Sequence, residues 1–252
     1  MFSVLITGSR GFLGTTLRKV LSKQEDIRIL EFGRTDSDKL LHEYIKVADF
    51  IFHFAGEVRP ASSDEGFASS NSELTTRIVS ILFSENKKTP ILLTSTIHAI
   101  EPQNMYGKTK QESERVVEKY ANEQQAAAWI YRLPHVFGPG CKENYNSVLS
   151  TWIYNSHNNL EINVFNRDIK MNYCYSLDLI SHFVTHLEYK SKAGCQYIIP
   201  ENIFNTSLGD VVDLIDNFKK NIKGLKVKYI EGSFEEKLYL TYQSYANNKK
   251  TQ

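Results

Sequence analysis

The sequence predicts an α/β protein with a Rossmann-type doubly wound parallel sheet and a smaller C-terminal lobe. Two observations carry this prediction. Short apolar runs alternate with segments of helical periodicity through the first half of the chain, and glycines follow directly after the first run. Strands that alternate with helices form a parallel sheet covered on both faces. Glycines between a first strand and a first helix are typical of the tight turn that opens such a fold.

Five apolar runs are the predicted strands of the sheet, at residues 2–7, 27–32, 49–54, 91–94 and 127–131. The first run is apolar throughout and is closed by glycine, as expected for a strand buried on both faces. The first helix places Leu13, Leu17 and Leu21 on one side, and further helices are predicted around 39–46, 73–83 and 106–122. The chain therefore crosses from strand to helix repeatedly before residue 134.

Beyond about Pro134 the alternation breaks down, and segments rich in Asn and Tyr separate short apolar runs. A helix is predicted over 208–218, with Thr206 or Ser207 as its N-cap. We expect residues 1–134 to form the cofactor-binding domain, with a returning segment near 171–190. Residues 135–170 and 191–252 should form a substrate-binding lobe at the carboxyl ends of the strands, where such sheets bind ligands.

Composition narrows the class of partner. The 252 residues carry a formal net charge of +1, which gives no electrostatic argument for nucleic acid or an anionic membrane, so a small molecule in a pocket is expected. The three cysteines are too widely spaced for a zinc pattern or a disulfide framework. No run approaches the roughly 18 to 20 apolar residues of a membrane span, and no leader precedes the first strand, so a cytoplasmic protein is expected.

The glycine turn between the first strand and the first helix predicts a dinucleotide site. One glycine permits the tight turn, one lets the backbone approach a pyrophosphate, and one lets helix pack on strand. The positive end of the helix then faces the phosphates. The predicted cofactor-binding residues of this turn are Gly8, Arg10, Gly11, Phe12, Leu13 and Gly14.

The residues after the second strand favour NADP(H) over NAD(H). Enzymes that use NAD usually carry an acidic residue at the end of this strand, which binds the ribose hydroxyls. Here Arg34 follows the strand and Arg10 lies in the turn, and two guanidinium groups suit a 2′-phosphate. Glu31 is the competing signal for NAD(H).

Hydroxyl groups and a Tyr-x-x-x-Lys pattern predict the catalytic site. Ser95 and Thr96 end the fourth strand, and Tyr106 and Lys110 follow at helical spacing i, i+4, which places both on one helix face. A cation one turn away should lower the pKa of the phenol, which is about 10 in water. Tyr106 could then exchange a proton with a carbonyl oxygen while the Thr96 or Ser95 hydroxyl hydrogen-bonds that oxygen.

Taken with these residues, the chain resembles the extended short-chain dehydrogenases that modify nucleotide sugars, above all the reductase domains of capsular polysaccharide enzymes. The resemblance covers about residues 1 to 245. It rests on the glycine turn, Thr96 and the Tyr-Lys pair together with five further marks, namely His53-Phe54-Ala55-Gly56, Asn71, Arg132 to Gly138, and the runs 141–148 and 208–214.

The resemblance implies NADPH-dependent reduction of the C4 ketone of a UDP-2-acetamido-2,6-dideoxy-hexos-4-ulose. It implies that Lys110, Ala55 and Gly56 contact the cofactor, and that the chain forms a homodimer. The candidate substrate-binding residues are Arg59, Ser95, His135, Lys142 and Asn146. The capsular enzymes also carry a cupin domain that epimerises the sugar, which we expect to be a separate protein here. Many relatives have asparagine where His135 stands.

Three alternative functions differ from this one in the residues that they need. A 4,6-dehydratase needs acidic residues directly after the strand-end threonine, and Ile97 and His98 stand there, so this activity is excluded. A 4-epimerase uses the same Tyr, Lys and hydroxyl but retains NAD, so it stays as the alternative. A dinucleotide-binding sensor has no need of both Tyr106 and Lys110 and ranks lower.

His182 and His186 at i, i+4 lack an evident third ligand for a metal site.

Overall fold

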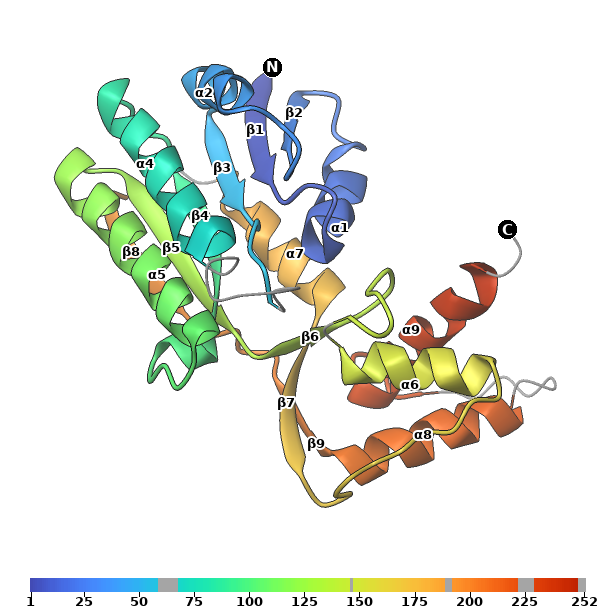
Figure 1. Ribbon diagram of the computed structural model, residues 1–252. Helices are drawn as coiled ribbons and strands as arrows, with labels where there is room; N and C mark the ends of the chain where they lie inside the picture. Colours follow the sequence, from blue (N-terminus) through green and yellow to red (C-terminus); the bar gives the residue numbers. More distant parts are fainter. Residues whose placement is uncertain (59–67, 146, 189–191, 222–228, 249–252) are drawn as a thin grey trace. The chain divides into compact units, whose positions relative to one another are not determined.

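The computed structural model describes residues 1–58, 68–145, 147–188, 192–221 and 229–248 (Figure 1). The chain divides into two compact units. Unit 1 comprises Met1–Leu133 and Ile180–Pro200, and unit 2 comprises Pro134–Leu179 and Glu201–Gln252. Each unit has its own sheet and its own core.

Unit 1 is built on a six-stranded sheet in which every neighbouring pair of strands is parallel. The strand order is β2-β1-β3-β4-β5-β8. The strands are β1 (Phe2–Thr7), β2 (Ile27–Phe32), β3 (Phe50–His53), β4 (Ile91–Thr96), β5 (Ala127–Leu133) and β8 (Gly194–Ile198). The fold class predicted from the sequence is confirmed.

Helices cover the sheet of unit 1 and bury an aliphatic core. Figure 1 shows α4 and α5 side by side over the strands. The helices are α1 (Phe12–Leu21), α2 (Asp38–Val47), α4 (Leu74–Ser84) and α5 (Met105–Gln124), with a π-helical turn η1 (Ala68–Glu73) before α4 and a 3-10 turn η2 (Ile97–Ala99) after β4. Leu5, Ile51 and Leu93 from the strands pack against Ile78 and Val117 from these helices, and all five are fully buried.

The order of the strands places a topological switch point at β1 and β3. The chain passes from β1 to β2 at one edge of the sheet, then returns to pair β3 on the other side of β1. In sheets of this kind the crevice for a ligand opens at the carboxyl ends of the two strands where the order reverses. The glycine turn follows β1 and Gly56 follows β3, so both lie at this crevice.

Unit 2 contains a small three-stranded sheet and four helical segments. Its strands are β6 (His135–Phe137), β7 (Lys170–Tyr175) and β9 (Phe204–Ser207), of which β6 and β7 are parallel and β7 and β9 antiparallel. Its helices are α6 (Val148–His157), α8 (Leu208–Asn221) and α9 (Phe234–Asn248), together with the first residues of α7 (Ser176–Thr185). The predicted helix over 208–218 is present as α8.

The structure places the domain boundaries differently from the sequence prediction at one point. The segment that returns to unit 1 is Ile180–Pro200, whereas the prediction placed it near 171–190 and assigned 191–252 to the other lobe. The reason lies in strand pairing. β7 pairs with β6 and β9 in unit 2, while β8 pairs with β5 and so extends the large sheet.

Candidate active site

The glycine turn of unit 1 has the geometry of a phosphate-binding turn. Gly8 has φ of +69°, and a Cβ there would lie 2.7 Å from the Ala55 backbone nitrogen. A Cβ on Gly14 would lie 2.2 Å from the Gly8 carbonyl oxygen, so only glycine lets α1 start this close to the turn. Gly11 is the N-cap of α1 and brings no side chain to the first amides, which suits an anion at the helix N-terminus.

The two arginines of the predicted cofactor site converge on the loop after β2. The Arg34 guanidinium pairs with Glu57 at 2.6 Å, although 79% of the Arg34 side chain is exposed. The Arg10 guanidinium donates to the Thr35 hydroxyl at 3.2 Å and lies 3.8 Å from the Asp36 carboxylate. Both cations therefore stand at the end of β2, beside the crevice.

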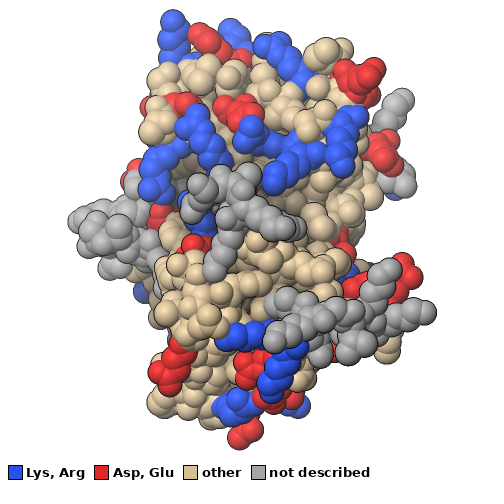
Figure 2. Space-filling view, turned by 90° about the vertical axis from the view of Figure 1, so that its right-hand side faces the viewer, with Lys and Arg blue, Asp and Glu red and all other residues tan. Residues whose placement is uncertain are grey.

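Glu31 is engaged elsewhere. Its carboxylate pairs with Arg18 of α1 at 2.7 Å, on the outer edge of the sheet. Figure 2, a view from the side of α1 and β2, shows Lys and Arg side chains gathered over this part of unit 1. In the sequence, α1, β2 and the loops beside them carry several Lys and Arg residues: Arg10, Arg18, Lys19, Lys23, Arg28 and Arg34.

The strand-end threonine and the tyrosine of α5 meet at the carboxyl edge of the sheet. Thr96 is the last residue of β4, and its hydroxyl accepts a hydrogen bond from the His98 amide in η2. Asn104 caps α5 by accepting from the Gly107 amide at 2.9 Å, so that Tyr106 lies in the first turn of the helix. The Thr96 side chain lies close enough to the Tyr106 hydroxyl to lower the pKa of the phenol. The structure thus brings together the two groups that the sequence assigned to the ketone oxygen.

The protonation of Tyr106 differs from the expectation. Burial raises the pKa of the phenol above its ordinary value, and the nearby Thr96 side chain opposes this rise without reversing it. The prediction that Lys110 lowers this pKa is therefore not met, because the loss of solvation outweighs the other effects. Tyr106 is a neutral phenol at neutral pH, which is the form that can donate a proton.

Lys110 lies one helical turn beyond Tyr106 and is buried. Its Nζ donates to the Thr94 carbonyl oxygen at 2.8 Å and lies 3.2 Å from where a Cβ on Gly56 would be. The ammonium therefore stands between the ends of β4 and β3, next to the crevice. Burial lowers the pKa of Lys110 to about 8, and the Glu114 carboxylate works against this change.

A chain of buried polar groups holds the end of β3. The His53 ring bonds the Thr7 hydroxyl at 2.6 Å and the Thr75 hydroxyl at 2.8 Å, and Thr75 donates to the Asn71 carbonyl. Burial lowers the pKa of His53 to about 3, so its ring is neutral. The Asn71 side chain accepts from the Glu57 amide. His53 is thus a satisfied core histidine that fixes the two strands flanking the crevice.

Ser95 occupies a different place from its neighbour Thr96. The strand alternates, so Ser95 points to the opposite face of β4, where its hydroxyl donates to the Glu114 carboxylate at 2.5 Å. Ser95 was predicted as a substrate-binding residue, and in the structure it is buried with its hydroxyl on Glu114. Glu114 itself was missed, although its spacing of four residues from Lys110 was a usable signal.

The remaining predicted substrate residues belong to unit 2 or lie outside the described residues. His135 begins β6 and is exposed, and Lys142 is exposed on the segment that follows. Arg59 and Asn146 lie outside the described residues.

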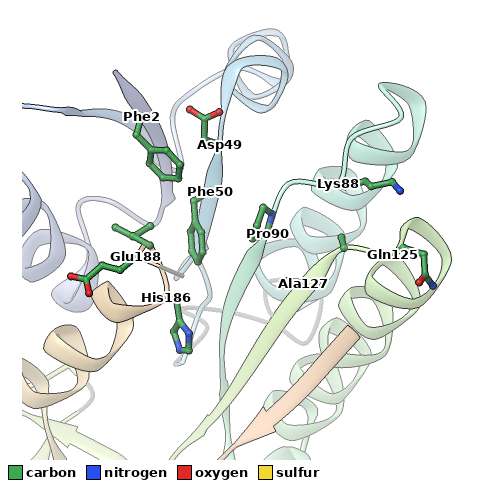
Figure 3. Close-up of a pocket in the computed structure, with 11 residues that line it drawn as sticks. Phe2, Asp49, Phe50, Lys88, Pro90, Gln125, Ala127, His186 and Glu188 are labelled. Atoms are coloured by element: carbon green, nitrogen blue, oxygen red, sulfur yellow. The ribbon is translucent and has the colours of Figure 1, made fainter. Parts of the chain in front are cut away.

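A cavity of about 490 Å³ in unit 1 lies at the opposite edge of the sheet from Thr96, Tyr106 and Lys110 (Figure 3). Phe2 and Pro90 mark the amino ends of their strands, and His186 follows α7. The His186 ring packs on Trp129 at 4.4 Å and bonds the Tyr131 hydroxyl. This cavity is therefore distinct from the crevice at the carboxyl ends of β1 and β3.

Among the described residues, no three or more His, Cys, Asp or Glu side chains gather as metal ligands would. The rings of His182 and His186 are 5.7 Å apart and both contact the Tyr131 ring. The three cysteines are free. In the part of the chain that the structure describes, no helix combines the length and apolar character of a membrane span.

Comparison with known proteins agrees with this geometry. The NAD dependent epimerase/dehydratase family matches residues 4–199. The chain belongs to this family. It is also 32% identical over 243 residues to a Pseudomonas aeruginosa UDP-2-acetamido-2,6-beta-L-arabino-hexul-4-ose reductase, an alignment that spans 96% of this chain and 64% of that protein.

Solved structures extend the comparison. The crystal structure of CapF, a capsular polysaccharide assembling protein from Staphylococcus aureus, matches with a TM-score of 0.83 and 34% identity over 96% of this chain and 65% of CapF. The resemblance predicted from the sequence is confirmed. A UDP-glucuronic acid 4-epimerase from Bacillus cereus, solved with NAD, has the same fold with a TM-score of 0.83 and 15% identity over 98% of this chain and 99% of that protein. The chain spans about two thirds of the length of the Pseudomonas reductase and of CapF.

Proposed function

We propose that this chain catalyses the NADPH-dependent reduction of the C4 ketone of a UDP-2-acetamido-2,6-dideoxy-hexos-4-ulose. The observation that carries the proposal is the placement of Thr96 at the end of β4 beside Tyr106, a neutral phenol in the first turn of α5, with Lys110 one turn further on. Bound NADPH supplies the hydride. As the ketone oxygen gains charge, Tyr106 donates its proton to it, and Thr96 hydrogen-bonds the same oxygen.

Lys110 has two tasks in this proposal. Its ammonium holds the ribose of the nicotinamide, and its charge stabilises the phenolate that Tyr106 becomes after the proton has left. The second task matters because burial disfavours the phenolate. With a pKa of about 8, Lys110 is mostly charged at neutral pH and loses its charge on the basic side. The proposed reduction should therefore slow above pH 8.

The choice of NADPH rests on Arg34 and Arg10. Both guanidinium groups stand at the end of β2, where a 2′-phosphate on the adenosine ribose would lie in a fold of this kind. Glu31 is paired with Arg18 on the outer edge and does not compete for that position. The exposed Arg34 can exchange Glu57 for a phosphate without being drawn out of the core.

The substrate is proposed from the relatives. The Pseudomonas protein is named as a reductase of a UDP-linked 2-acetamido-2,6-hexulose, and it aligns with nearly the whole of this chain. His135 and Lys142 of unit 2 are our candidates for contacts with the nucleotide sugar, together with Arg59 and Asn146. A homodimer is also proposed, on the strength of the family resemblance, and sedimentation velocity would test it.

The alternative is an NAD-dependent 4-epimerase, the activity named for the Bacillus cereus protein that shares the fold. An epimerase begins by removing a proton from a sugar hydroxyl, which calls for a phenolate. Arg34 and Arg10 at the end of β2 favour an exchangeable NADPH, and with it net reduction, over a retained NAD. A dinucleotide-binding sensor is a weaker candidate, because the chain carries the complete Thr96, Tyr106 and Lys110 set.

The decisive experiment mixes purified chain with NADPH and freshly generated UDP-4-keto-6-deoxy-HexNAc and follows absorbance at the nicotinamide wavelength. A fall in absorbance with a product heavier by two hydrogens in mass spectrometry supports reduction. Interconversion of two UDP-sugars with bound NAD and no net change in absorbance would identify the epimerase. Cofactor binding with neither reaction would identify the sensor.

A further inference from the structure

Glu114 is a buried carboxylate that the proposed reaction does not use directly. It lies on α5 one turn beyond Lys110, and only 1% of its side chain is exposed. A buried charge is costly unless it is paired, and a buried ion pair by itself adds little stability. The position of this group therefore calls for an explanation beyond packing.

The Glu114 carboxylate joins three elements at the catalytic edge of the sheet. It accepts from Ser95 of β4 at 2.5 Å and from the Arg132 guanidinium of β5 at 2.6 Å and 3.1 Å. Ser95 stands between Thr94, whose carbonyl accepts from Lys110, and Thr96, which lies beside the Tyr106 hydroxyl. The contact of Glu114 with Ser95 thus fixes the strand that carries both of these residues.

The charge of Glu114 also acts on Lys110. Within the described residues, Glu114 is the carboxylate that raises the pKa of Lys110 against the effect of burial. Three uncharged groups of the described residues also face this ammonium: Tyr106 on the same helix, the Thr94 carbonyl of β4, and the His53 ring of β3, whose pKa of about 3 keeps it neutral. Arg132 shares the carboxylate from the far side, where its guanidinium also lies 4.3 Å above the Tyr197 ring.

We propose that Glu114 is a positioning residue for the ketone reduction, which keeps Lys110 charged and ties the end of β4 to the middle of α5. This inference rests on the proposed function, since it concerns the same catalytic pair. In this proposal Ser95 and Arg132 are the groups that hold the Glu114 carboxylate in place.

The test is the pH dependence of kcat/KM for NADPH-dependent reduction. Glu114→Gln keeps the shape of the side chain and removes the charge. Its basic limb should move to lower pH by about 0.5 to 1 unit, because the ammonium of Lys110 loses the support of a nearby anion. Glu112→Gln removes a carboxylate from the exposed face of the same helix and should leave the limb where it is.

Two further variants separate charge from packing. Glu114→Asp keeps the charge, so its basic limb should stay near that of the wild type even if the rate falls. Arg132→Gln leaves the carboxylate with one cation instead of two and should move the limb to higher pH. General loss of stability cannot produce shifts of opposite sign in Glu114→Gln and Arg132→Gln.

A lower rate in Glu114→Gln at every pH, with an unmoved limb in both variants, would overturn the inference and leave Glu114 as a structural residue. The inference can also be tested without turnover. The pH dependence of NADPH binding, followed by nicotinamide fluorescence, reports the charge of Lys110. An absence of reduction in the wild type overturns the proposed function, whereas an identical binding profile in wild type and Glu114→Gln overturns the role of Glu114.

Discussion

The two units of this chain bury their polar side chains in opposite ways. In unit 1 the buried groups at the carboxyl edge of the sheet are joined in series, from Thr7 through His53 and Thr75 to Asn71. In unit 2 the hydroxyl groups of Tyr173, Tyr175 and Ser176 are buried with no hydrogen-bond partner among the described residues. Directional bonds thus join the buried polar groups at this edge of unit 1, whereas unit 2 also contains buried hydroxyls that are held by packing without a hydrogen bond.

The cores differ in part. One cluster of unit 1 is mostly aliphatic, with Leu, Ile and Val from strands and helices, and a second group of buried residues in the same unit carries the rings of Phe50, Phe52, Trp129, Tyr131 and Phe183. The core of unit 2 is dominated by rings, including Phe137, Trp152, Tyr173, Tyr175, Phe218, Tyr242 and Tyr245. A buried hydrogen-bond series whose members are all satisfied makes the surrounding core rigid. The comparison teaches that Thr96, Tyr106 and Lys110 stand on the unit that contains this series.

The largest expected effect comes from removing the proposed proton donor of unit 1, the Tyr106 hydroxyl. Tyr106→Phe should reduce turnover by about 10²- to 10⁴-fold, because the proton donor is lost. NADPH binding, measured by fluorescence, should be unchanged. Tyr120→Phe, on the same helix but remote from the crevice, is the control and should keep its turnover. More than a tenth of wild-type activity in Tyr106→Phe would contradict the proposed mechanism.

The second prediction concerns the cofactor edge of unit 1. Arg34→Ala should raise the KM for NADPH by roughly 10- to 100-fold, the loss expected for one charge-assisted phosphate contact. The KM for NADH should hardly change, because NADH has no 2′-phosphate. Arg18→Ala is the control, because it removes a neighbouring cation that pairs with Glu31. Equal losses for the two cofactors in Arg34→Ala would argue against NADPH specificity.

A third prediction concerns the buried series around His53 and follows the stability of unit 1 as a function of pH. The pKa of His53 is about 3 in the folded protein and 6.5 when unfolded, so the unfolded chain binds the proton first and stability falls as pH drops below 6.5. This one histidine should cost about 2 kcal/mol between pH 7.5 and pH 5. His53→Gln should remove that part of the acid dependence. His98→Gln, at an exposed position, should keep it.

These measurements can be made on each unit separately, because each holds one of the two tryptophans. Trp129 lies in β5 of unit 1 and Trp152 in α6 of unit 2. In a Trp152→Phe background, fluorescence reports the unfolding of unit 1 alone. An acid dependence that is the same with and without His53 would show that the buried series does not govern the stability of unit 1.

The smallest expected effect compares one hydroxyl from each unit. The Tyr120 hydroxyl donates to the Thr89 carbonyl at 2.8 Å, so Tyr120→Phe should lower the free energy of unfolding of unit 1 by about 1 kcal/mol. The Tyr175 hydroxyl has no partner among the described residues, so Tyr175→Phe should leave unit 2 unchanged or slightly more stable. Urea unfolding in the two single-tryptophan backgrounds would measure both. Equal losses would break the contrast between the units.

Most of unit 1 could be predicted from the sequence, and most of unit 2 could not. The runs that form β1 and β2 and the glycine turn are local signals, since each depends on a few consecutive residues. β8 and β7 were harder to assign, because their partners are distant in the chain and neither run is strongly apolar: in β8 only Cys195, Tyr197 and Ile198 are apolar. Whether such a run forms a strand depends on the distant strands that are available to pair with it, and a local sequence pattern carries no information about them.

For the site, the sequence determined which chemical groups are present and in what order: the glycine turn, the strand-end Thr96, and Tyr106 with Lys110 one helical turn apart. Spacing is enough here, because a strand end and a helix face follow from local periodicity. The tertiary structure decided their states. Burial raises the pKa of Tyr106, where a neighbouring cation was expected to lower it. The packing of α5 on β4 and β5 brings Glu114 against Ser95 and Arg132. Solvation and charge depend on everything packed around a group, and only the folded chain sets that.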